Sequence, residues 1–405
     1  MTARVCLASL AILGVLILGS CASVPEPERE PPLPSRPSLP PAAPPSGAEE
    51  RQKLVDELLA GMTLKQLIGQ RFVTFLDGPE ITAEEDRLVR RGLVGGFIIY
   101  PQNVVDRGQV ADLTSELQRT AASGSPGVGL LLAADQEGGR VAALRLSDMP
   151  RFPAARSWAR HEDEAYVEAA SYVVNRELRS VGINMNFAPV LDVYEHADDS
   201  IIGDRAFAAD PELVSRLGRA YLRGADRAGV IAVPKHFPGH GSTAVDSHGR
   251  LPVVGLSPQE LYGRHLGPFR AAVDSGAEAI MTAHLLLPAL DPEHPVTLSR
   301  PIVEGLLREE LGFSGVVISD GVAMGAISQN YSSAEAIELS IDAGIDIILV
   351  HTRYDVSELV ETTVELVEEG RVSRDRLVEG TRRVLELKAG HGLLSYPSGG
   401  DTFHR

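Results

Sequence analysis

The stretch at residues 235–248, KHFPGHGSTAVDSH, concentrates side chains that can do chemistry. It holds three of the chain's 11 histidines, together with a lysine and an aspartate. A set of this kind binds a metal ion, moves protons or holds a polar substrate. The position of the stretch in the fold decides among these three possibilities.

A metal site is the first possibility. The three histidines could ligate zinc, with Asp246 or Asp320 as a carboxylate partner. Their spacing matches none of the common zinc signatures, and Lys235 beside His236 would place a positive charge next to the ion. No glycine-rich phosphate fingerprint follows an apolar run either, so we expect no metal and no nucleotide cofactor.

Proton and nucleophile chemistry fits the residues better. Asp246 and His248 are two residues apart, so on an extended loop their side chains would point the same way. A neighbouring carboxylate favours the charged form of an imidazole, which would make His248 a general acid; a solvated loop histidine is the alternative. Asp320 ends an apolar run between Ser319 and Gly321. It could serve as a nucleophile, a base, an acceptor for sugar hydroxyls or a helix N-cap.

A nucleophilic carboxylate with a separate acid is the arrangement found in retaining glycosidases. The acid protonates the leaving oxygen while the carboxylate captures the sugar. The usual scheme uses two carboxylates, and an aspartate–histidine pair would here replace the second. Four more polar residues could form hydrogen bonds with sugar hydroxyls: Asp135, Arg205, Lys235 and His236.

Eight apolar runs that alternate with helical patterns must position these residues. The runs span residues 67–75, 94–100, 129–135, 182–193, 230–236, 277–285, 314–320 and 344–351. Such near-continuous apolar runs indicate strands covered on both faces, as in a parallel sheet. Asp210 before Pro211 and Ser257 before Pro258 are typical of helix starts. The alternation predicts an α/β fold, a single (β/α)8 TIM-like barrel, with an open doubly wound sheet as the alternative.

The ends of these runs indicate where the site lies. Barrel active sites occupy the carboxyl ends of the strands, so polar residues should gather where each run stops. The third run ends in ADQEGGR, the fifth continues into the stretch 235–248, and the seventh ends in SDG. This rim is therefore the candidate site.

The N-terminal residues 1–20 are expected to be a lipoprotein signal peptide. A short apolar run follows Arg4, which is typical of a secretory signal and too short for a comfortable transmembrane helix. The ending LGSC resembles a bacterial lipobox, in which Cys21 would be lipidated. Ordinary signal cleavage with an incidental Cys21 is the alternative.

The remaining chain divides into a spacer, a catalytic barrel and a tail. Residues 21–50 are rich in proline and predict a semi-rigid spacer behind the lipid anchor. The barrel would occupy residues 51–396 and the tail residues 397–405. The net charge of −17 argues against nucleic acid as a partner. We expect a monomer without an intrachain disulfide, because one cysteine would remain after cleavage.

Six motifs that occur in order along the chain after the spacer closely resemble those of family 3 glycoside hydrolases of the β-N-acetylhexosaminidase type. They are KHFPGHG…DSH, DQEGGRV, NFAPVLDV, GDRAF, MTAH and SDGVAMGAI. The resemblance covers roughly residues 54–394 and implies a (β/α)8 barrel that cleaves terminal β-linked N-acetylglucosamine, often in peptidoglycan fragments.

The same resemblance implies a role for each matching residue. Asp320 falls on the nucleophile that forms a glycosyl-enzyme, and His248 falls on the acid/base with Asp246 as its partner. The sugar-binding positions fall on Asp135, Arg205, Lys235 and His236. His240 is then expected to be structural.

Two positions depart from the family pattern. Ala143 stands where an arginine is common, with Arg145 two places further on, and Gly321 stands where a second aspartate is common. Both departures bear on substrate specificity rather than on the proposed chemistry. The location is also expected to differ from that of cytoplasmic relatives, since an anchored chain would lie in the cell envelope. Without an aspartate after Cys21, the outer membrane is the favoured membrane.

Three alternatives remain open at this point. The same site could use phosphate instead of water and act as a phosphorylase. A β-glucosidase of the same family usually adds a further domain after the barrel, which this chain is not expected to have. A lipoprotein that only binds sugar would not need Asp246, His248 and Asp320 together.

Overall fold

The computed structural model describes residues 47–195, 201–243, 245–350 and 354–394. The expected signal peptide 1–20, Cys21, most of the spacer 21–50 and the tail 397–405 lie outside these residues. Helix α1 (Ala48–Gly61) begins three residues before the expected start of the barrel. Among the described helices, none has both the length and the apolar composition needed to cross a bilayer.

Eight parallel strands build the centre of the fold. They are β1 (Phe72–Phe75), β2 (Gly96–Ile99), β3 (Leu131–Ala134), β6 (Met185–Asn186), β7 (Ile231–Ala232), β8 (Ala279–Met281), β9 (Val316–Ile318) and β10 (Ile348–Leu349). Six of them form one sheet in the order β10-β1-β2-β3-β6-β7, and β8 and β9 form a separate pair. Each strand follows the expected order of the apolar runs.

The eight strands do not form one continuous ladder. Among the described residues, one parallel bridge joins the two sheets on each side, between Phe237 and Thr282 and between Ile318 and Ile347. A few backbone hydrogen bonds accompany each bridge. The expected (β/α)8 barrel is therefore confirmed as an α/β fold with a TIM-like, open barrel and not as a closed sheet. Part of the reason is proline, which has no N–H for a ladder. Pro189 follows β6 and Pro234 follows β7, so these strands are far shorter than the runs 182–193 and 230–236.

The first predicted strand, 67–75, was too long at its beginning. Residues Leu64–Gly69 form helix α2, and β1 starts only at Phe72. A capping box explains the helix: the Thr63 side chain accepts from the Gln66 N–H, and the Gln66 side chain accepts from the Thr63 N–H. The apolar residues after Gln66 favoured a strand, so the capping box was not recognised as the start of a helix.

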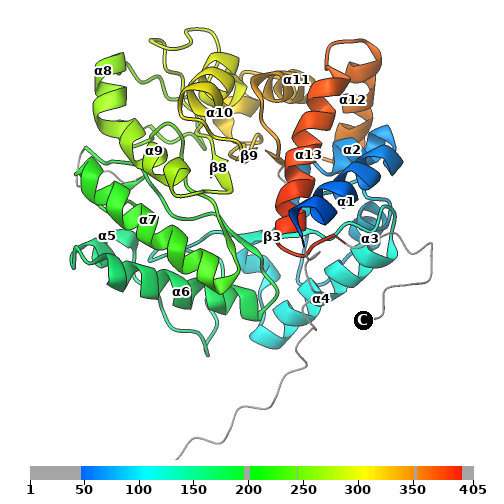
Figure 1. Cartoon of the computed structure of the whole chain (residues 1–405), viewed down its shortest axis with the longest axis horizontal. Coiled ribbons are helices and arrows are strands. Elements are labelled where there is room, and N and C mark those ends of the chain that lie inside the picture. The colour runs from blue at the N-terminus through cyan, green and yellow to red at the C-terminus, as the bar shows by residue number, and fades with distance from the viewer. Residues whose placement is uncertain (1–46, 196–200, 244, 351–353, 395–405) are drawn as a thin grey trace, which may run out of the picture. The chain divides into compact units, whose positions relative to one another are not determined.

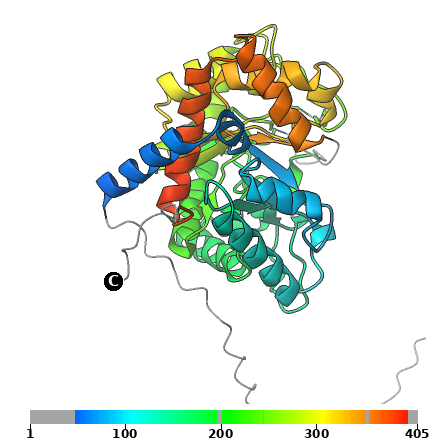
Figure 2. The same cartoon turned by 90° about the vertical axis from the view of Figure 1, so that its right-hand side faces the viewer.

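Helices surround the strands (Figure 1). The longer ones are α3 (Ala83–Arg90), α4 (Arg107–Ser123), α6 (Glu164–Ser180), α7 (Pro211–Ala228), α9 (Leu266–Asp274), α11 (Ser333–Ala343), α12 (Val356–Glu368) and α13 (Arg374–Gly390). Short helices are α5 (Ala155–Ala159), α8 (Pro258–Glu260) and α10 (Gly325–Ser328), and single 3-10 turns are η1 (Pro101–Asn103), η2 (Gly203–Arg205) and η4 (Val296–Leu298). Among the described residues, two π-helices, η3 (Leu261–His265) and η5 (Pro301–Glu310), complete the set. Helix α1 lies against α13, so the two ends of the described chain pack together (Figure 2).

The predicted helix starts at Asp210 and Ser257 are confirmed. The Asp210 side chain accepts from the Glu212 N–H at the start of α7, and the Ser257 side chain accepts from the Glu260 N–H at the start of α8. Helix α7 ends at Gly229, whose φ of 69° is left-handed and suits a residue without Cβ. Local signals thus fix where the chain turns back toward the sheet.

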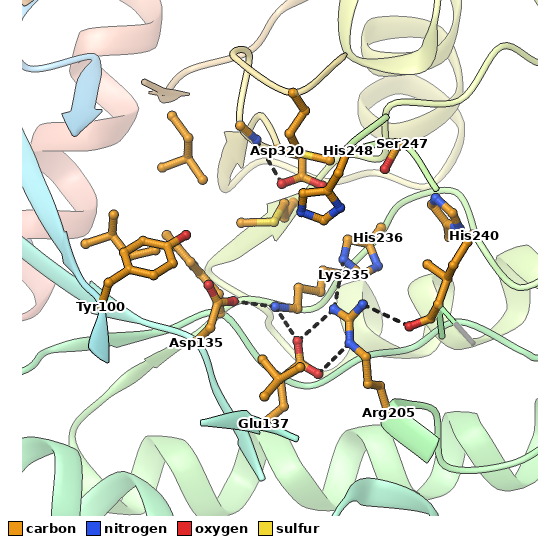
Figure 3. Close-up of a pocket in the computed structure, with 18 of the residues that line it drawn as sticks. Tyr100, Asp135, Glu137, Arg205, Lys235, His236, His240, Ser247, His248 and Asp320 are labelled. Carbon is orange, nitrogen blue, oxygen red and sulfur yellow. Dashed lines mark hydrogen bonds and ion pairs between the residues drawn. The ribbon is translucent and has the colours of Figure 1, made fainter. Parts of the chain in front are cut away.

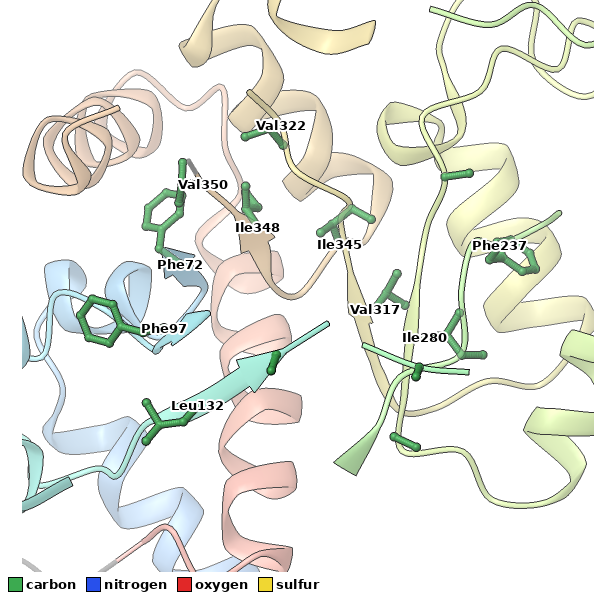
Figure 4. Packing of buried hydrophobic residues seen from close by; sticks show 14 of the residues in the cluster. Phe72, Phe97, Leu132, Phe237, Ile280, Val317, Val322, Ile345, Ile348 and Val350 are labelled. Atoms are coloured by element: carbon green, nitrogen blue, oxygen red, sulfur yellow. The ribbon is translucent and has the colours of Figure 1, made fainter. Parts of the chain in front are cut away.

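Strand side chains alternate between two buried layers. On β2 and β3, Phe97 and Leu132 face the layer between the strands and the helices (Figure 4), while Ile98 and Leu131 face the barrel interior. Both faces are buried, which is why the strands read as continuous apolar runs in the sequence. The interior layer also forms the floor of the cavity described below.

Candidate active site

A cavity of about 610 Å³ lies at the carboxyl ends of the strands. Its polar lining comes mainly from residues that follow β3, β7 and β9, and its floor includes Ile98 and Phe187 of the interior layer. Six of the seven expected catalytic and sugar-binding residues line it: Asp135, Arg205, Lys235, His236, His248 and Asp320 (Figure 3). The seventh, Asp246, contacts His248 from outside the lining.

A buried ionic network forms one side of the cavity. Lys235 Nζ lies 2.6 Å from Asp135 Oδ1 and 2.7 Å from Glu137 Oε1. Arg205 donates from Nε and Nη2 to the two oxygens of Glu137, each at 2.8 Å. Arg205 thus pairs with both oxygens of Glu137, and Lys235 bridges Asp135 and Glu137. These ion pairs hold all four side chains in place.

The protonation states in this network follow from the pairing. Burial lowers the pKa of Lys235, but Asp135 and Glu137 more than offset it, so the net pKa is raised and the ammonium persists. Burial raises the pKa of Glu137, but the charges of Arg205 and Lys235 outweigh burial and hold it well below its usual range. The network therefore presents fixed charges to a ligand over the ordinary pH range.

Glu137 was not identified from the sequence, although it lies inside the DQEGGRV motif. It belongs to the short strand β4 (Gln136–Gly138), which pairs with β5 (Val141–Ala142). Glu137 is two residues after Asp135, so alternation along an extended chain places both carboxylates on the same side. That spacing was the signal that could have found it.

His236 is held by a second buried acid, Asp192. Its Nδ1 donates to Asp192 Oδ2 at 2.7 Å, and Asp192 Oδ1 accepts from the His240 N–H at 2.7 Å. Burial raises the pKa of Asp192, but the two histidines outweigh it and bring the pKa to about 2. His236 Nε2 is thereby turned toward Arg205 Nη2, 3.5 Å away. Asp192 is the last polar residue of the NFAPVLDV motif and lies near the end of the predicted run 182–193, which was the unused signal.

Asp320 directly follows Ser319, two residues after Ile318 ends β9, and is half-buried at the cavity wall. Burial raises its pKa, but His284, His236 and the Gly321 N–H, which donates to Oδ1 at 2.8 Å, outweigh burial and lower the pKa. The carboxylate is therefore ionised. The alternative of a helix N-cap is wrong, because α10 begins at Gly325 with Met324 at the cap position.

His284, the histidine of the MTAH motif, lies behind Asp320, and the sequence assigned no role to it. It is fully buried, and its Nε2 donates to the Gly321 carbonyl at 3.0 Å, while Nδ1 lies 2.9 Å from Thr297 Oγ1. Burial lowers the pKa of His284. It fixes the backbone of Gly321, the position that departs from the family pattern. A Cβ at Gly321 would meet Met324 at 3.6 Å, an ordinary contact, so the glycine is not required by space.

Asp246 and His248 are paired, but by a turn rather than by an extended loop. Asp246 Oδ1 accepts from the His248 N–H at 2.9 Å and from His248 Nδ1 at 2.8 Å. The backbone contact is the i to i+2 pattern of an Asx-turn, which brings the two side chains together where strand alternation does not apply. Burial raises the pKa of Asp246, but the two bonds from His248 outweigh it and lower the pKa. His248 Nε2 is left for a ligand.

His240 packs inside the site rather than forming a charged contact. Its ring lies edge-on to that of His236, with centroids 5.9 Å apart. Burial lowers its pKa, and its Nδ1 has no hydrogen-bond partner among the described residues. Within those residues, no group of three or more histidine, cysteine or acidic side chains is arranged to hold a metal ion.

Ala143, the other departure from the family pattern, places no charged side chain in the cavity. Ala143 is buried, and its N–H donates to the Asp135 carbonyl at 2.9 Å. Arg145 is exposed and donates to the carbonyls of Arg140 and Ala142, outside the cavity lining. The cation that is common at this position is therefore not replaced by Arg145.

Apolar side chains complete the cavity. Phe75 and Tyr100 stack with ring centroids 4.6 Å apart at one wall, and Met281, Met324 and Leu349 also line it. Such surfaces bind the apolar faces of a ring while the charged groups hold its polar atoms. The cavity is thus suited to a small polar ring compound.

Comparison with known protein families shows which family this chain belongs to. The profile described as "Glycosyl hydrolase family 3 N terminal domain" matches residues 56–387. The chain belongs to glycosyl hydrolase family 3. The resemblance inferred from the six motifs is confirmed. The charged residues of the cavity, among them Asp135, Arg205 and Asp320, belong to those motifs.

Relatives of this family 3 member carry related names. The chain is 37% identical over 289 residues to a "Beta-hexosaminidase" of Thiobacillus denitrificans, covering 70% of this chain and 78% of the relative. It is 33% identical over 327 residues to "Beta-hexosaminidase A" of Pseudoalteromonas piscicida, covering 75% of this chain but only 55% of that protein. The chain thus spans little more than half of one relative and most of the other.

Solved structures show the same fold. A family 3 beta-N-acetylglucosaminidase from Paenibacillus sp. superposes with a TM-score of 0.79 at 38% identity, covering 85% of this chain and 65% of that one. A beta-N-acetylhexosaminidase from Beutenbergia cavernae superposes with a TM-score of 0.74 at 31% identity, covering 81% of this chain and 99% of that one. Both proteins are named as enzymes that act on N-acetylated amino sugars.

Proposed function

We propose that this family 3 member is a retaining exo-β-N-acetylhexosaminidase. It would hydrolyse terminal β-linked N-acetylglucosamine in peptidoglycan or chitin-type fragments. The observation that carries the proposal is the presence, in one cavity, of the ionised Asp320 carboxylate and an aspartate-paired His248. The names of the relatives support the sugar, and the chemistry follows from the site.

The first half of the reaction forms a glycosyl-enzyme. His248 donates its Nε2 proton to the glycosidic oxygen, because Nδ1 is engaged with Asp246. An Asp320 oxygen attacks the anomeric carbon as the bond to the leaving oxygen breaks, which gives an ester between Asp320 and the sugar. The leaving group departs as an alcohol, and His248 becomes neutral.

The second half returns the enzyme to its starting state. The neutral His248 removes a proton from water, and the water oxygen attacks the anomeric carbon. The bond to Asp320 breaks, so the carboxylate and the protonated His248 are both restored. The carboxylate of Asp246 stabilises the charged imidazole in the first and last states.

The ionic network would bind the sugar hydroxyls. Asp135 and Glu137 are acceptors, whereas Lys235 and Arg205 are donors. Both cations are already paired with carboxylates at 2.6–2.8 Å. A phosphate anion would have to compete with those carboxylates, which favours water over phosphate as the acceptor.

The test is release of the phenol from an aryl β-N-acetylglucosaminide, first without and then with phosphate. We expect activity in phosphate-free buffer and its loss in Asp320→Ala. Activity only with phosphate would show a phosphorylase, and activity only on an aryl β-glucoside would show a β-glucosidase. A protein that binds the sugar and turns over no substrate in either buffer would overturn the proposal.

We further propose that the mature protein is anchored in the cell envelope through a lipid on Cys21. The support is the sequence alone: the lipobox-like LGSC and the proline-rich segment behind it. The favoured location is the outer membrane, with fragments of the cell wall as the substrate.

A further inference from the structure

The loop that carries Asp246 and His248 is docked on the segment that follows Asp320. That segment continues from Asp320 into α10 (Gly325–Ser328). The Gly325 N–H donates to the His248 carbonyl at 2.9 Å, and the Ala326 N–H donates to the Ser247 carbonyl at 3.0 Å. One short helix thus holds the backbone on which the histidine is mounted.

A third hydrogen bond extends this dock. The side-chain amide of Gln329, just after α10, donates from Nε2 to the Gly249 carbonyl at 2.8 Å. Ser247 is buried where the loop contacts α10, whereas the side chains of its neighbours Asp246 and His248 are exposed. The main chain therefore fixes the loop, and the side chains of the pair project from it.

Gly325 permits the close approach of the two backbones. A Cβ at this position would lie 2.5 Å from the Gly249 oxygen and 2.8 Å from the Gly249 carbonyl carbon. Contacts this short with backbone atoms force a displacement, because neither backbone can rotate away as a side chain can. Any larger residue at position 325 must push the loop away from α10.

The nucleophile and the histidine consequently share one wall of the cavity. Gly321, Ala323 and Met324, which connect Asp320 to α10, line the cavity together with His248. A displacement of the loop backbone away from α10 would change the position of His248 relative to Asp320 without altering either side chain. A general acid works only within hydrogen-bond reach of the leaving oxygen, so this spacing governs the rate.

We propose that Gly325 is a positioning residue, with Gln329 in support, that sets the place of the acid/base His248 over Asp320. The proposal rests on the proposed roles of those two residues. Displacements of about 1 Å in a catalytic site cost on the order of 100-fold in rate. The loss should fall on steps that need proton transfer and spare steps that do not.

The experiment compares full-length Gly325→Ala with Gly255→Ala. Gly255 is exposed, and a Cβ there meets nothing within 4 Å, so its alanine variant is a matched control. Each is assayed on an N-acetylglucosamine disaccharide, a poor leaving group, and on a nitrophenyl β-N-acetylglucosaminide, which needs little protonation. Gly325→Ala should lose about 100-fold in kcat/KM on the disaccharide and much less on the nitrophenyl substrate.

Azide supplies a readout that general damage would not change. It attacks a glycosyl-enzyme without a base, so it should speed turnover of the nitrophenyl substrate by Gly325→Ala and by a His248→Ala reference. It should not speed wild type or Gly255→Ala. Gln329→Ala, which removes one bond and adds no clash, should show the same pattern in weaker form.

Two outcomes would overturn the positioning role. One is a Gly325→Ala protein with wild-type thermal stability and an unchanged ratio between the two substrates. The other is an equal loss on both substrates without azide rescue, which indicates a general distortion. A wild-type protein that is inactive on both substrates would instead contradict the proposed function, so the two failures are distinguishable.

Discussion

Among single side chains, Glu137 pairs with both cations of the buried ionic network, so the geometry of that network depends on it. It is almost fully buried and makes contacts with both Arg205 and Lys235. Without its charge, Arg205 would lose its hydrogen-bonded carboxylate, and Lys235 would keep the more exposed Asp135 as its paired carboxylate. Removing one member of a buried ion network leaves the others unpaired in a medium that solvates them poorly.

Glu137→Gln should therefore weaken sugar binding and the fold together. We expect the free energy of unfolding to fall by several kcal/mol, roughly 3–5, because a buried ion pair loses one partner. We expect kcat/KM for an aryl β-N-acetylglucosaminide to fall by about 10- to 100-fold, because Arg205 and Lys235 are no longer held in place. The melting temperature should fall as well. Glu309→Gln is the matched control, because Glu309 is exposed. Unchanged kinetics in Glu137→Gln would mean that the network is not used by the substrate.

The sequence predicted which residues gather, but not which acids fix them. Asp135, Lys235, His236 and Asp320 could be placed together because they lie just after predicted strands, and strand ends meet at one edge of a parallel sheet. Arg205 and His248 lie in longer connections, and only the resemblance to the family placed them with the others. Glu137 and Asp192 escaped because their motifs contain several polar residues, and the sequence does not say which are buried. Their partners are 68 and 44 residues away in the chain, for Arg205 and His236, so no local pattern records the contact.

Among the elements, α13 carries a buried charge without a counter-charge. Lys388 is fully buried, and its Nζ donates to the Gln70 amide oxygen and the Gly95 carbonyl, both neutral. Burial lowers its pKa to about 7 from 10.5. The amine loses its proton in the folded state well before it would do so in the unfolded chain.

Stability should therefore rise with pH above 7. Between pH 7 and about 10.5 the unfolded chain binds a proton that the folded chain does not, so unfolding becomes less favourable as pH rises. The rise is at most about 5 kcal/mol over this window. Urea unfolding at several pH values measures it, and Lys388→Met should flatten it. Lys53→Met, at an exposed lysine, should leave the slope unchanged.

Element boundaries were less predictable than element order. The order of all eight strands followed from apolar runs, since each run must be covered on both faces. The lengths did not follow, because Pro189 and Pro234 interrupt ladders and the Thr63–Gln66 capping box starts a helix within an apolar run. Hydrophobicity sets which segments are buried, whereas backbone donors and caps set where each element ends.

For the whole molecule, the expected anchor makes a prediction about location. With Cys21 lipidated, the protein should fractionate with membranes when expressed in a bacterium that processes lipoproteins. Cys21→Ser should move it to the soluble fraction, because it removes the acyl chains that bind the bilayer. Cys6→Ser is the control, since Cys6 would leave with the signal peptide. A Cys21→Ser protein that stays on the membrane would contradict lipidation at this residue.

The division of the strands into six and two has a consequence for ligand binding. Asp135, Lys235 and His236 follow strands of the six-stranded sheet, whereas Asp320 follows a strand of the separate pair. A ligand that contacts both sets of residues would span a joint that is made of one bridge and a few backbone hydrogen bonds. Because binding to the folded state alone stabilises that state, such a ligand would also stabilise the contact between the two sheets.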